Sequence, residues 1–158
     1  MSTTIIAKMI EGAVFSCLIL LAQAQRPPDI VKWTAHLTQQ SASAATIDLS
    51  ADIQSGWHVY ALSEPTGGPN PLTVSLPEGE AFALNGPVHE SAPTRHFDPT
   101  FKMETAFYLN HVQLIASIKK SKGETATSIP INVRFQACSD NLCMPPYTAH
   151  LIADSAAK

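Results

Sequence analysis

Two cysteines near the end of the chain are the side chains best suited to carry chemistry. Cys138 and Cys143 enclose the run Ser-Asp-Asn-Leu, whose residue types favour a turn. Such a pair can form a disulfide, exchange electrons with another thiol–disulfide pair, or bind a soft metal ion. In the chain-entropy model, a disulfide that closes a loop of about six residues contributes only about 2 kcal/mol. The spacing differs from the C-x-x-C of thioredoxin-like motifs, so it does not by itself separate a structural staple from a redox pair.

The flanking segments predict that the cysteines lie at the mouth of a β-hairpin. Apolar and polar residues alternate over residues 129–136 and again over residues 147–152, as in strands with one buried face. Pro145 and Pro146 lie between the second cysteine and the second strand, where they stiffen the chain and remove two backbone donors. Residues that face each other across such a mouth can come close enough for a disulfide.

The rest of the chain predicts an all-β sandwich. Short alternating segments recur with turn signals between them, and short connections favour antiparallel pairing. We expect strands at residues 31–37, 47–53, 57–62, 72–76, 81–84, 101–109, 112–118, 129–136 and 147–152. We expect residues 26–29 to be an extended lead-in, and residues 64–71 and 91–100 to be long loops. The second of these loops carries His96, Phe97 and Asp98.

Residues 1–24 resemble a secretory signal peptide. Lys8 precedes an apolar run over residues 12–21, and Ala22-Gln-Ala24 fits the small-x-small cleavage pattern, so we expect cleavage before Gln25. The apolar run is shorter than the roughly 20 residues that span a bilayer, so we expect no membrane span in the mature chain. Cys17 would leave with the signal peptide unless it is a lipid-attachment site. The remaining residues 25–158 form one domain, whose two cysteines should be paired at least part of the time in an oxidising compartment.

Two other classes of function remain open at this point. A net charge of −3 without a basic cluster argues against nucleic acid as a partner. The six histidines lack zinc-ligand spacing, but Cys138, Cys143 and Met144 are soft ligands that would suit a periplasmic copper carrier. The other alternative is a non-catalytic binding sandwich with a structural disulfide, which predicts a reduction potential below about −300 mV.

Some aromatic and polar residues are candidates to surround the cysteines. Phe97 lies in a polar, proline-rich segment, where it either anchors its own loop or covers a reactive sulfur pair. His58 and Tyr60 share one face of their expected strand and either line a site or pack in the sandwich. Basic neighbours such as His58 or His96 could raise the amount of thiolate.

The hairpin sequence resembles a known family. The run Val-Arg-Phe-Gln-Ala-Cys-Ser-Asp-Asn-Leu-Cys-Met-Pro-Pro-Tyr-Thr at residues 133–148 is similar to the active-site hairpin of the N-terminal periplasmic domain of the DsbD thiol:disulfide interchange family. Supporting matches are Ser-Gly-Trp-His-Val-Tyr at residues 55–60, Val-Ser-Leu-Pro-Glu-Gly at 74–79, and the loop that leads into residues 104–108. The resemblance extends from about Trp33 to Leu151.

The resemblance implies an immunoglobulin-like β-sandwich located in the periplasm. It also implies a relay of reducing equivalents from a membrane or thioredoxin-like donor to oxidised periplasmic proteins, such as disulfide isomerases and factors of cytochrome c biogenesis. No cofactor is implied beyond the cysteine pair. Because the sequence ends after one domain without a thioredoxin-like segment, we expect the electron donor to be a separate protein.

The resemblance also implies roles for individual residues. Cys138 and Cys143 would be the redox pair, and Cys143 would form the mixed disulfide with a partner. Phe97 would be the aromatic residue of a protective cap, and Tyr60 and His58 would line the site.

The sequence departs from the family pattern in two places. The loop between the cysteines is one residue shorter than in the pattern. Arg95 and His96 replace the paired acids expected before the cap aromatic, and Asp98 follows it.

Overall fold

The computed structural model describes residues 25–79, 81–121 and 127–155, which form two β-sheets and one short helix. Residues 1–24, with the expected signal peptide and Cys17, lie outside this part of the chain. Within it, no helix has both the length and the apolar character needed to cross a membrane. The helix, α1 (Pro27–Ile30), replaces the extended lead-in that the sequence predicted. The carboxylate of Asp29 in this helix accepts hydrogen bonds from the backbone N–H and the side chain of Arg26.

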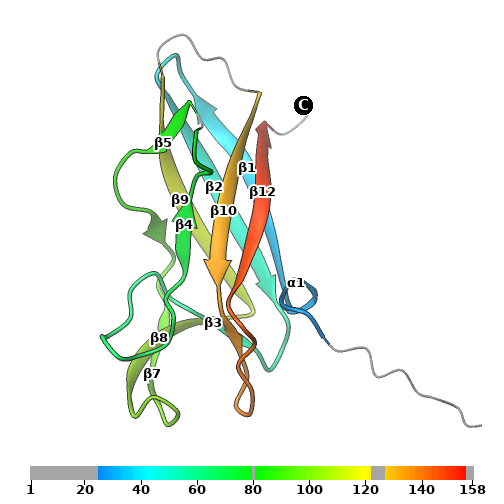
Figure 1. The fold of residues 1–158 in the computed structure, drawn as a ribbon, viewed down its shortest axis with the longest axis vertical. Coiled ribbons are helices and arrows are strands. Elements are labelled where there is room, and N and C mark those ends of the chain that lie inside the picture. Colours follow the sequence, from blue (N-terminus) through cyan, green and yellow to red (C-terminus); the bar gives the residue numbers. More distant parts are fainter. Residues whose placement is uncertain (1–24, 80, 122–126, 156–158) are drawn as a thin grey trace, which may run out of the picture.

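The larger sheet has eight strands and forms the long body of the molecule (Figure 1). Its order is β4 (Thr73–Ser75), β10 (Ser128–Phe135), β12 (Tyr147–Ser155), β1 (Val31–Gln40), β2 (Ala44–Ile53), β9 (His111–Lys120) and β5 (Phe82–Leu84), with β6 (His89–Glu90) also paired to β9. All of these pairs are antiparallel except β1 with β12, which is parallel. The antiparallel prediction rests on short connections between consecutive strands, and it does not apply to β1 and β12, which are the first and last strands of the chain.

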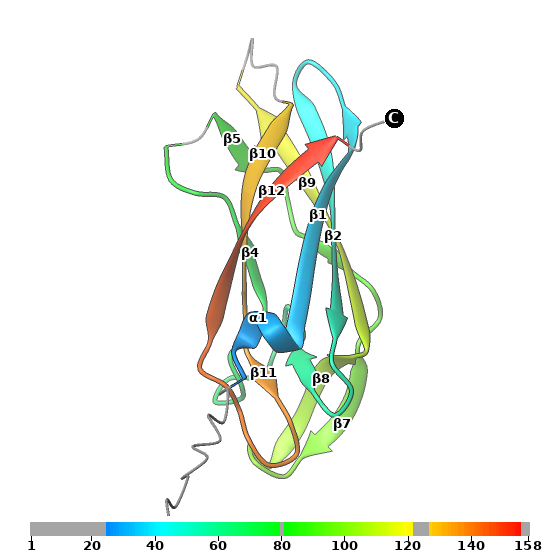
Figure 2. The ribbon, with the colours of Figure 1, turned by 90° about the vertical axis from the view of Figure 1, so that its right-hand side faces the viewer.

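The hydrophobic core is enclosed by this sheet. Figure 2 shows β10 and β12 along one side of the body and β2 and β9 along the other. Inward-facing residues from both sides are fully buried, as the alternation in the sequence predicted. They include Ile47, Leu49, Val112, Leu114, Ile131 and Val133, each with an exposed fraction of 0%.

The smaller sheet has four strands and lies at one end of the body (Figures 1 and 2). Its order is β11 (Ala137–Cys138), β3 (His58–Tyr60), β8 (Met103–Leu109) and β7 (Thr94–Asp98). The chain passes from β10 of the large sheet to β11 of the small sheet across one residue, Gln136. The Gln136 side chain accepts a hydrogen bond from Asn70 at 3.0 Å and donates one to the Met144 carbonyl at 3.0 Å. This crossing places Cys138 in the small sheet.

Two sequence predictions for the small sheet were wrong in detail. Residues 94–98 form strand β7 and are not loop, because all five residues pair with β8. The apolar–polar alternation that marks a strand is missing there because β7 is an edge strand whose residues are largely exposed. In β3, Val59 and Tyr60 are both buried, so the expected alternation does not hold. The turn after β7 accounts for this, since Phe101 packs edge-on against Tyr60 at a ring-centroid distance of 6.0 Å.

We predict that the inward face of β10 contributes strongly to stability. Ile131→Ala should lower the free energy of unfolding by about 2–5 kcal/mol, because it removes a fully buried side chain and leaves a cavity. Ile152→Ala on neighbouring β12 is the matched control, because Ile152 is 56% exposed and its truncation should cost no more than about 0.5 kcal/mol. Urea unfolding of the two variants measures the difference. Equal losses in both would show that β10 does not hold the core.

Candidate functional site

The two cysteines are joined in a disulfide at the end of the hairpin. Their Sγ atoms are 2.08 Å apart and their Cα atoms 4.0 Å apart. The loop between them is also closed by backbone hydrogen bonds, from Ser139 N to Leu142 O at 2.8 Å and from Met144 N to Ala137 O at 2.8 Å. The Ser139 hydroxyl accepts a further bond from Leu142 N at 3.2 Å. The turn therefore has hydrogen bonds of its own besides the disulfide.

The two cysteines differ in exposure. Cys138 is 1% exposed and lies on β11 directly opposite His58 of β3. Cys143 is exposed and lines a pocket of ≈ 410 Å³. An approaching protein can therefore reach Cys143, while Cys138 is buried.

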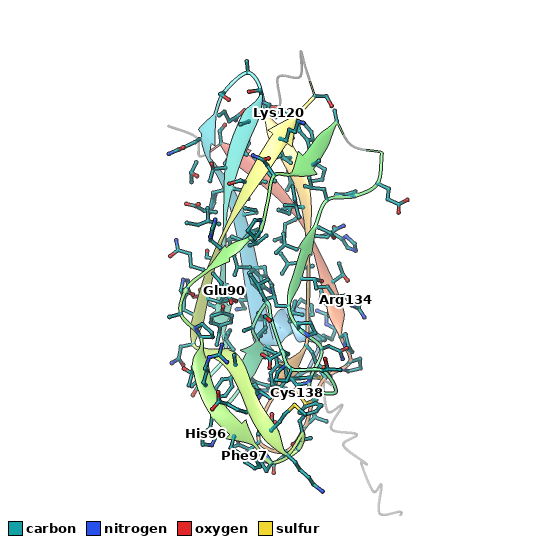
Figure 3. All side chains as sticks on the ribbon, turned by 90° about the vertical axis from the view of Figure 1, so that its left-hand side faces the viewer. Glu90, His96, Phe97, Lys120, Arg134 and Cys138 are labelled. Atoms are coloured by element: carbon teal, nitrogen blue, oxygen red, sulfur yellow. A yellow bond between two sulfur atoms is a disulfide. The ribbon has the colours of Figure 1, made fainter. Side chains whose placement is uncertain are left out.

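The pocket brings together most of the site residues that the sequence predicted. Cys143 shares it with His58 and Tyr60 of β3 and with His96, Phe97 and Asp98 of β7. In Figure 3, Cys138, His96 and Phe97 lie at the same end of the molecule, far from Lys120. Cys138 does not line the pocket. Arg95 is also absent from its lining, and forms an exposed ion pair with Glu104 at 3.9 Å.

Sequence reasoning missed the contribution of β8 and of the hairpin loop to the pocket. Phe107 and Leu109 line it from β8, and Ser139 and Asp140 line it from the loop between the cysteines. The residues of β8 take this place because Phe107 pairs with Tyr60 and Leu109 pairs with His58. This register is a tertiary property, and no motif in the sequence marked it.

Phe97 lies at the rim of the pocket. Its exposed fraction is 58%, although it is a large apolar side chain. It lines the pocket from β7, which is separated from β11 by β3 and β8. Such an exposed position does not fit an aromatic residue that folds back to anchor its own segment.

Asp98 and Tyr60 form a hydrogen-bonded pair in the pocket. The Tyr60 hydroxyl donates to Asp98 Oδ2 at 2.9 Å. Asp98 Oδ1 accepts from Thr100 N at 2.8 Å and from Phe101 N at 3.3 Å. Partial burial would raise the pKa of Asp98, but these hydrogen bonds outweigh it and hold the pKa below its ordinary value. Burial and the bond to Asp98 together raise the pKa of Tyr60 far above neutrality, so Tyr60 remains a donor.

His58 is held between aromatic rings. Its ring lies 5.1 Å from that of Tyr60, edge-on, and 5.0 Å from that of Phe107. Burial lowers the pKa of His58, and the negative charges of Asp98 and Asp140 only partly oppose this effect. The imidazole is therefore neutral near pH 7, so His58 does not supply the positive charge that was one possible way to raise the amount of thiolate.

Two glutamates hold the small sheet in place behind the pocket. Glu64 accepts hydrogen bonds from Ala61 N at 3.3 Å and Ala106 N at 3.1 Å. Glu90 accepts from Leu62 N at 3.1 Å and from the Tyr108 hydroxyl. Glu64 thus joins the segment after β3 to β8, and Glu90 joins both of them to β6, which belongs to the large sheet. Neither glutamate was singled out by its sequence context.

The described residues contain no group of three or more His, Cys, Asp or Glu side chains arranged to hold a metal ion. Both cysteine sulfurs are used in the disulfide. The copper-carrier alternative uses the Cys138 and Cys143 thiolates as ligands, so it needs the pair to be reduced first.

Comparisons with known proteins agree with this architecture. The family model of the N-terminal domain of the thiol:disulfide interchange protein DsbD matches residues 25–154. The fold is similar to the N-terminal domain of DsbD from Neisseria meningitidis, solved in the reduced form, with a TM-score of 0.57 and 13% identity over 83% of this chain and 90% of that one. A search of curated protein sequences found no match.

A second solved structure is also similar. The N-terminal periplasmic domain of ScsB from Proteus mirabilis aligns with a TM-score of 0.57 and 18% identity, over 83% of this chain and 49% of that one. The chain thus spans about half the length of the ScsB domain. At such low identity these similarities establish the fold, and they confirm the expected immunoglobulin-like β-sandwich.

We predict that the Asp98 carboxylate stabilises the folded protein in a pH-dependent way. A group whose pKa is lowered by folding stabilises the folded state above its unfolded pKa, and this contribution disappears as the pH falls through the folded pKa. Asp98→Asn should therefore lower the free energy of unfolding at pH 7, and this difference should shrink below about pH 4. Urea unfolding at pH 7 and pH 3 measures both values. Asp154→Asn, at an exposed position of β12, is the control and should change stability by less than about 0.5 kcal/mol. A loss in Asp98→Asn that is independent of pH would contradict the role of the carboxylate charge.

Proposed function

Because the chain belongs to the family of the N-terminal domain of the thiol:disulfide interchange protein DsbD, we propose that it is a periplasmic protein-disulfide reductase that relays reducing equivalents through Cys138 and Cys143. The family and the disulfide fit a thiol:disulfide exchange module. The observation that carries the proposal is the unequal exposure of the two sulfurs. One cysteine is open to an approaching protein, and the other is held behind it at bonding distance.

The relay first receives electrons. A thiolate of the donor attacks the Cys143 sulfur, a mixed disulfide forms, and Cys138 leaves as a thiolate that takes up a proton. The second thiol of the donor then attacks its own half of the mixed disulfide. Cys143 leaves and is protonated in turn. The donor has lost two electrons and two protons, and the module has gained both.

The module then passes the electrons on by the reverse chemistry. Cys143 attacks the disulfide of an oxidised partner, and Cys138 attacks Cys143 to release the reduced partner and restore the internal disulfide. Cys138 suits this second step because it is shielded from other proteins. Thioredoxin-like domains are the donors we propose, and oxidised periplasmic thiol proteins are the recipients. Disulfide isomerases and factors of cytochrome c biogenesis are the recipients that the family resemblance suggests.

A structural staple is the weaker explanation of the disulfide. The loop that it closes is short, so its contribution to stability is about 2 kcal/mol in the chain-entropy model. The same turn is already closed by the backbone bonds at Ser139 and Met144. A bond needed only for stability has little reason to leave one of its cysteines exposed in a pocket.

Phe97 has the role of a cover in this proposal. Its exposed ring on β7 lines the same pocket as Cys143 and can shield the sulfur from small thiols and oxidants. A docking protein would displace it. The periplasmic location rests on the expected signal peptide at residues 1–24 and on the similarity to a domain described as periplasmic.

We predict that Cys138→Ala traps covalent complexes. The variant keeps the attacking sulfur of Cys143 and lacks the one that resolves the mixed disulfide, so partners should accumulate as adducts. The measurement is non-reducing electrophoresis and mass spectrometry of the variant isolated from its own compartment. Cys143→Ala is the matched control, and it should trap far fewer adducts because Cys138 is buried. The absence of adducts in Cys138→Ala would remove the main support for the relay.

We predict that Phe97→Ala speeds the reaction of the disulfide with a small thiol such as dithiothreitol, by about threefold or more. Removal of the ring opens the pocket to reagents that are too small to displace it. The rate can be followed by quenching and counting free thiols. Ile115→Ala, at an exposed position of β9 outside the pocket, should leave the rate unchanged. An unchanged rate in Phe97→Ala would show that the ring does not shield the sulfurs.

A further inference from the structure

His58 occupies the position closest in register to the buried cysteine. It pairs with Cys138 across β3 and β11, and with Leu109 across β3 and β8. Its side chain also lines the pocket that contains Cys143. His58 therefore lies on β3, between β11, which carries Cys138, and β8, and it shares a pocket with Cys143. The contacts with Tyr60 and Phe107 hold its ring in this place.

The exchange reaction requires proton transfer at this position. A thiol must lose its proton before it attacks, and each leaving sulfur must gain one. When a partner protein docks over Cys143, it also displaces the water that would otherwise accept or supply that proton. Burial of a thiol further disfavours its ionisation. A base inside the pocket can accept the proton of the thiol in place of the displaced water and so favour the thiolate. Histidine is the side chain best suited to this proton transfer near neutral pH.

The other titratable groups around the pocket are less suited to this role. Asp98 accepts three hydrogen bonds and its pKa is lowered, so it is a weak base. Tyr60 has a strongly raised pKa and keeps its proton. His96 is exposed on the edge strand β7, and Asp140 is exposed in the hairpin loop. Half-buried His58 is neutral near pH 7, and the carboxylates of Asp98 and Asp140 would stabilise it once it is protonated.

We propose that His58 is the proton-transfer residue of the cysteine pair. This inference rests on the proposed function. In the reduced protein, the Cys143 thiol gives its proton to the imidazole and attacks the partner disulfide, and the partner's leaving thiolate takes that proton. The Cys138 thiol then gives its proton to the same imidazole and attacks Cys143, and the second partner thiolate takes it. The protein loses two electrons and two protons, the partner gains both, and His58 ends neutral.

The test is the pH dependence of exchange in two variants. The reduced protein is mixed with an oxidised thioredoxin between pH 5 and 9, and the exchange rate is followed by stopped-flow fluorescence. For His58→Gln and His58→Phe, we expect a rate at pH 7 that is lower by about tenfold or more, since general acid–base catalysis typically contributes at least this much. The rates should approach that of the unchanged protein at pH 9, where the thiols ionise without help. His36→Gln, at an exposed position of β1, should follow the unchanged protein at every pH.

Several results would overturn the inference. A rate that falls equally at all pH values in both variants would indicate a packing or docking role for the imidazole. An unchanged profile in His58→Gln, or a pH-dependent loss in His96→Gln in its place, would assign proton transfer elsewhere. Urea unfolding of the two His58 variants checks that they remain folded. Failure of the unchanged protein to react with any thioredoxin-like partner would instead refute the proposed function, so the two failures are distinguishable.

Discussion

The burial of β10 in the hydrophobic core is the constraint on which the site depends. Its inward residues are fully enclosed, so the position of the strand is set to within the tolerance of a close-packed interior. Only Gln136 separates this strand from β11, so the fixed position of β10 also fixes the position of Cys138. Cys138 is buried there, whereas its disulfide partner Cys143 is exposed. The exposure of Cys143 and the concealment of Cys138 are thus two consequences of one packing arrangement.

The small sheet supplies most of the residues that form the pocket beside the exposed Cys143. Its strands come from three separate parts of the chain, and they gather at the end of the body where β10 ends (Figures 1 and 2). Hydrogen bonds from polar side chains help to hold these segments together. Glu64 and Glu90 accept backbone hydrogen bonds near β3 and β8, and Asp98 organises the turn after β7. At Asp98 these hydrogen bonds outweigh partial burial and hold the pKa below its ordinary value, whereas at Glu64 burial outweighs them and raises the pKa.

Burial decides the direction of the pKa shift of His58, and hydrogen bonds decide that of Asp98. The family pattern has paired acids before the cap aromatic, and this chain has Arg95 and His96 there, with Arg95 directed to Glu104 outside the pocket. The acid that does face the site is Asp98, and its hydrogen bonds stabilise its charge. Burial keeps His58 neutral. The pocket therefore contains a neutral base, His58, and an ionised carboxylate, Asp98, in place of two adjacent acids.

The sequence alone determined the local properties of this protein. Alternation of apolar residues predicted β10 and β12, turn-forming residues predicted the hairpin between them, and two cysteines at its mouth predicted the disulfide. These features depend on neighbours along the chain, and so they can be read from it. The all-β class followed from the same local patterns, and the family was suggested by the resemblance of the hairpin sequence to that family.

The tertiary structure decided which residues share the pocket. Phe107 and Leu109 reach it through the register of β8 with β3, and β7 is a strand because it pairs with β8, although its polar sequence predicted a loop. The neutral state of His58 likewise depends on burial by strands that are remote in sequence. Strand register, edge pairing and burial are cooperative properties of distant segments, and no single stretch of the chain contains them.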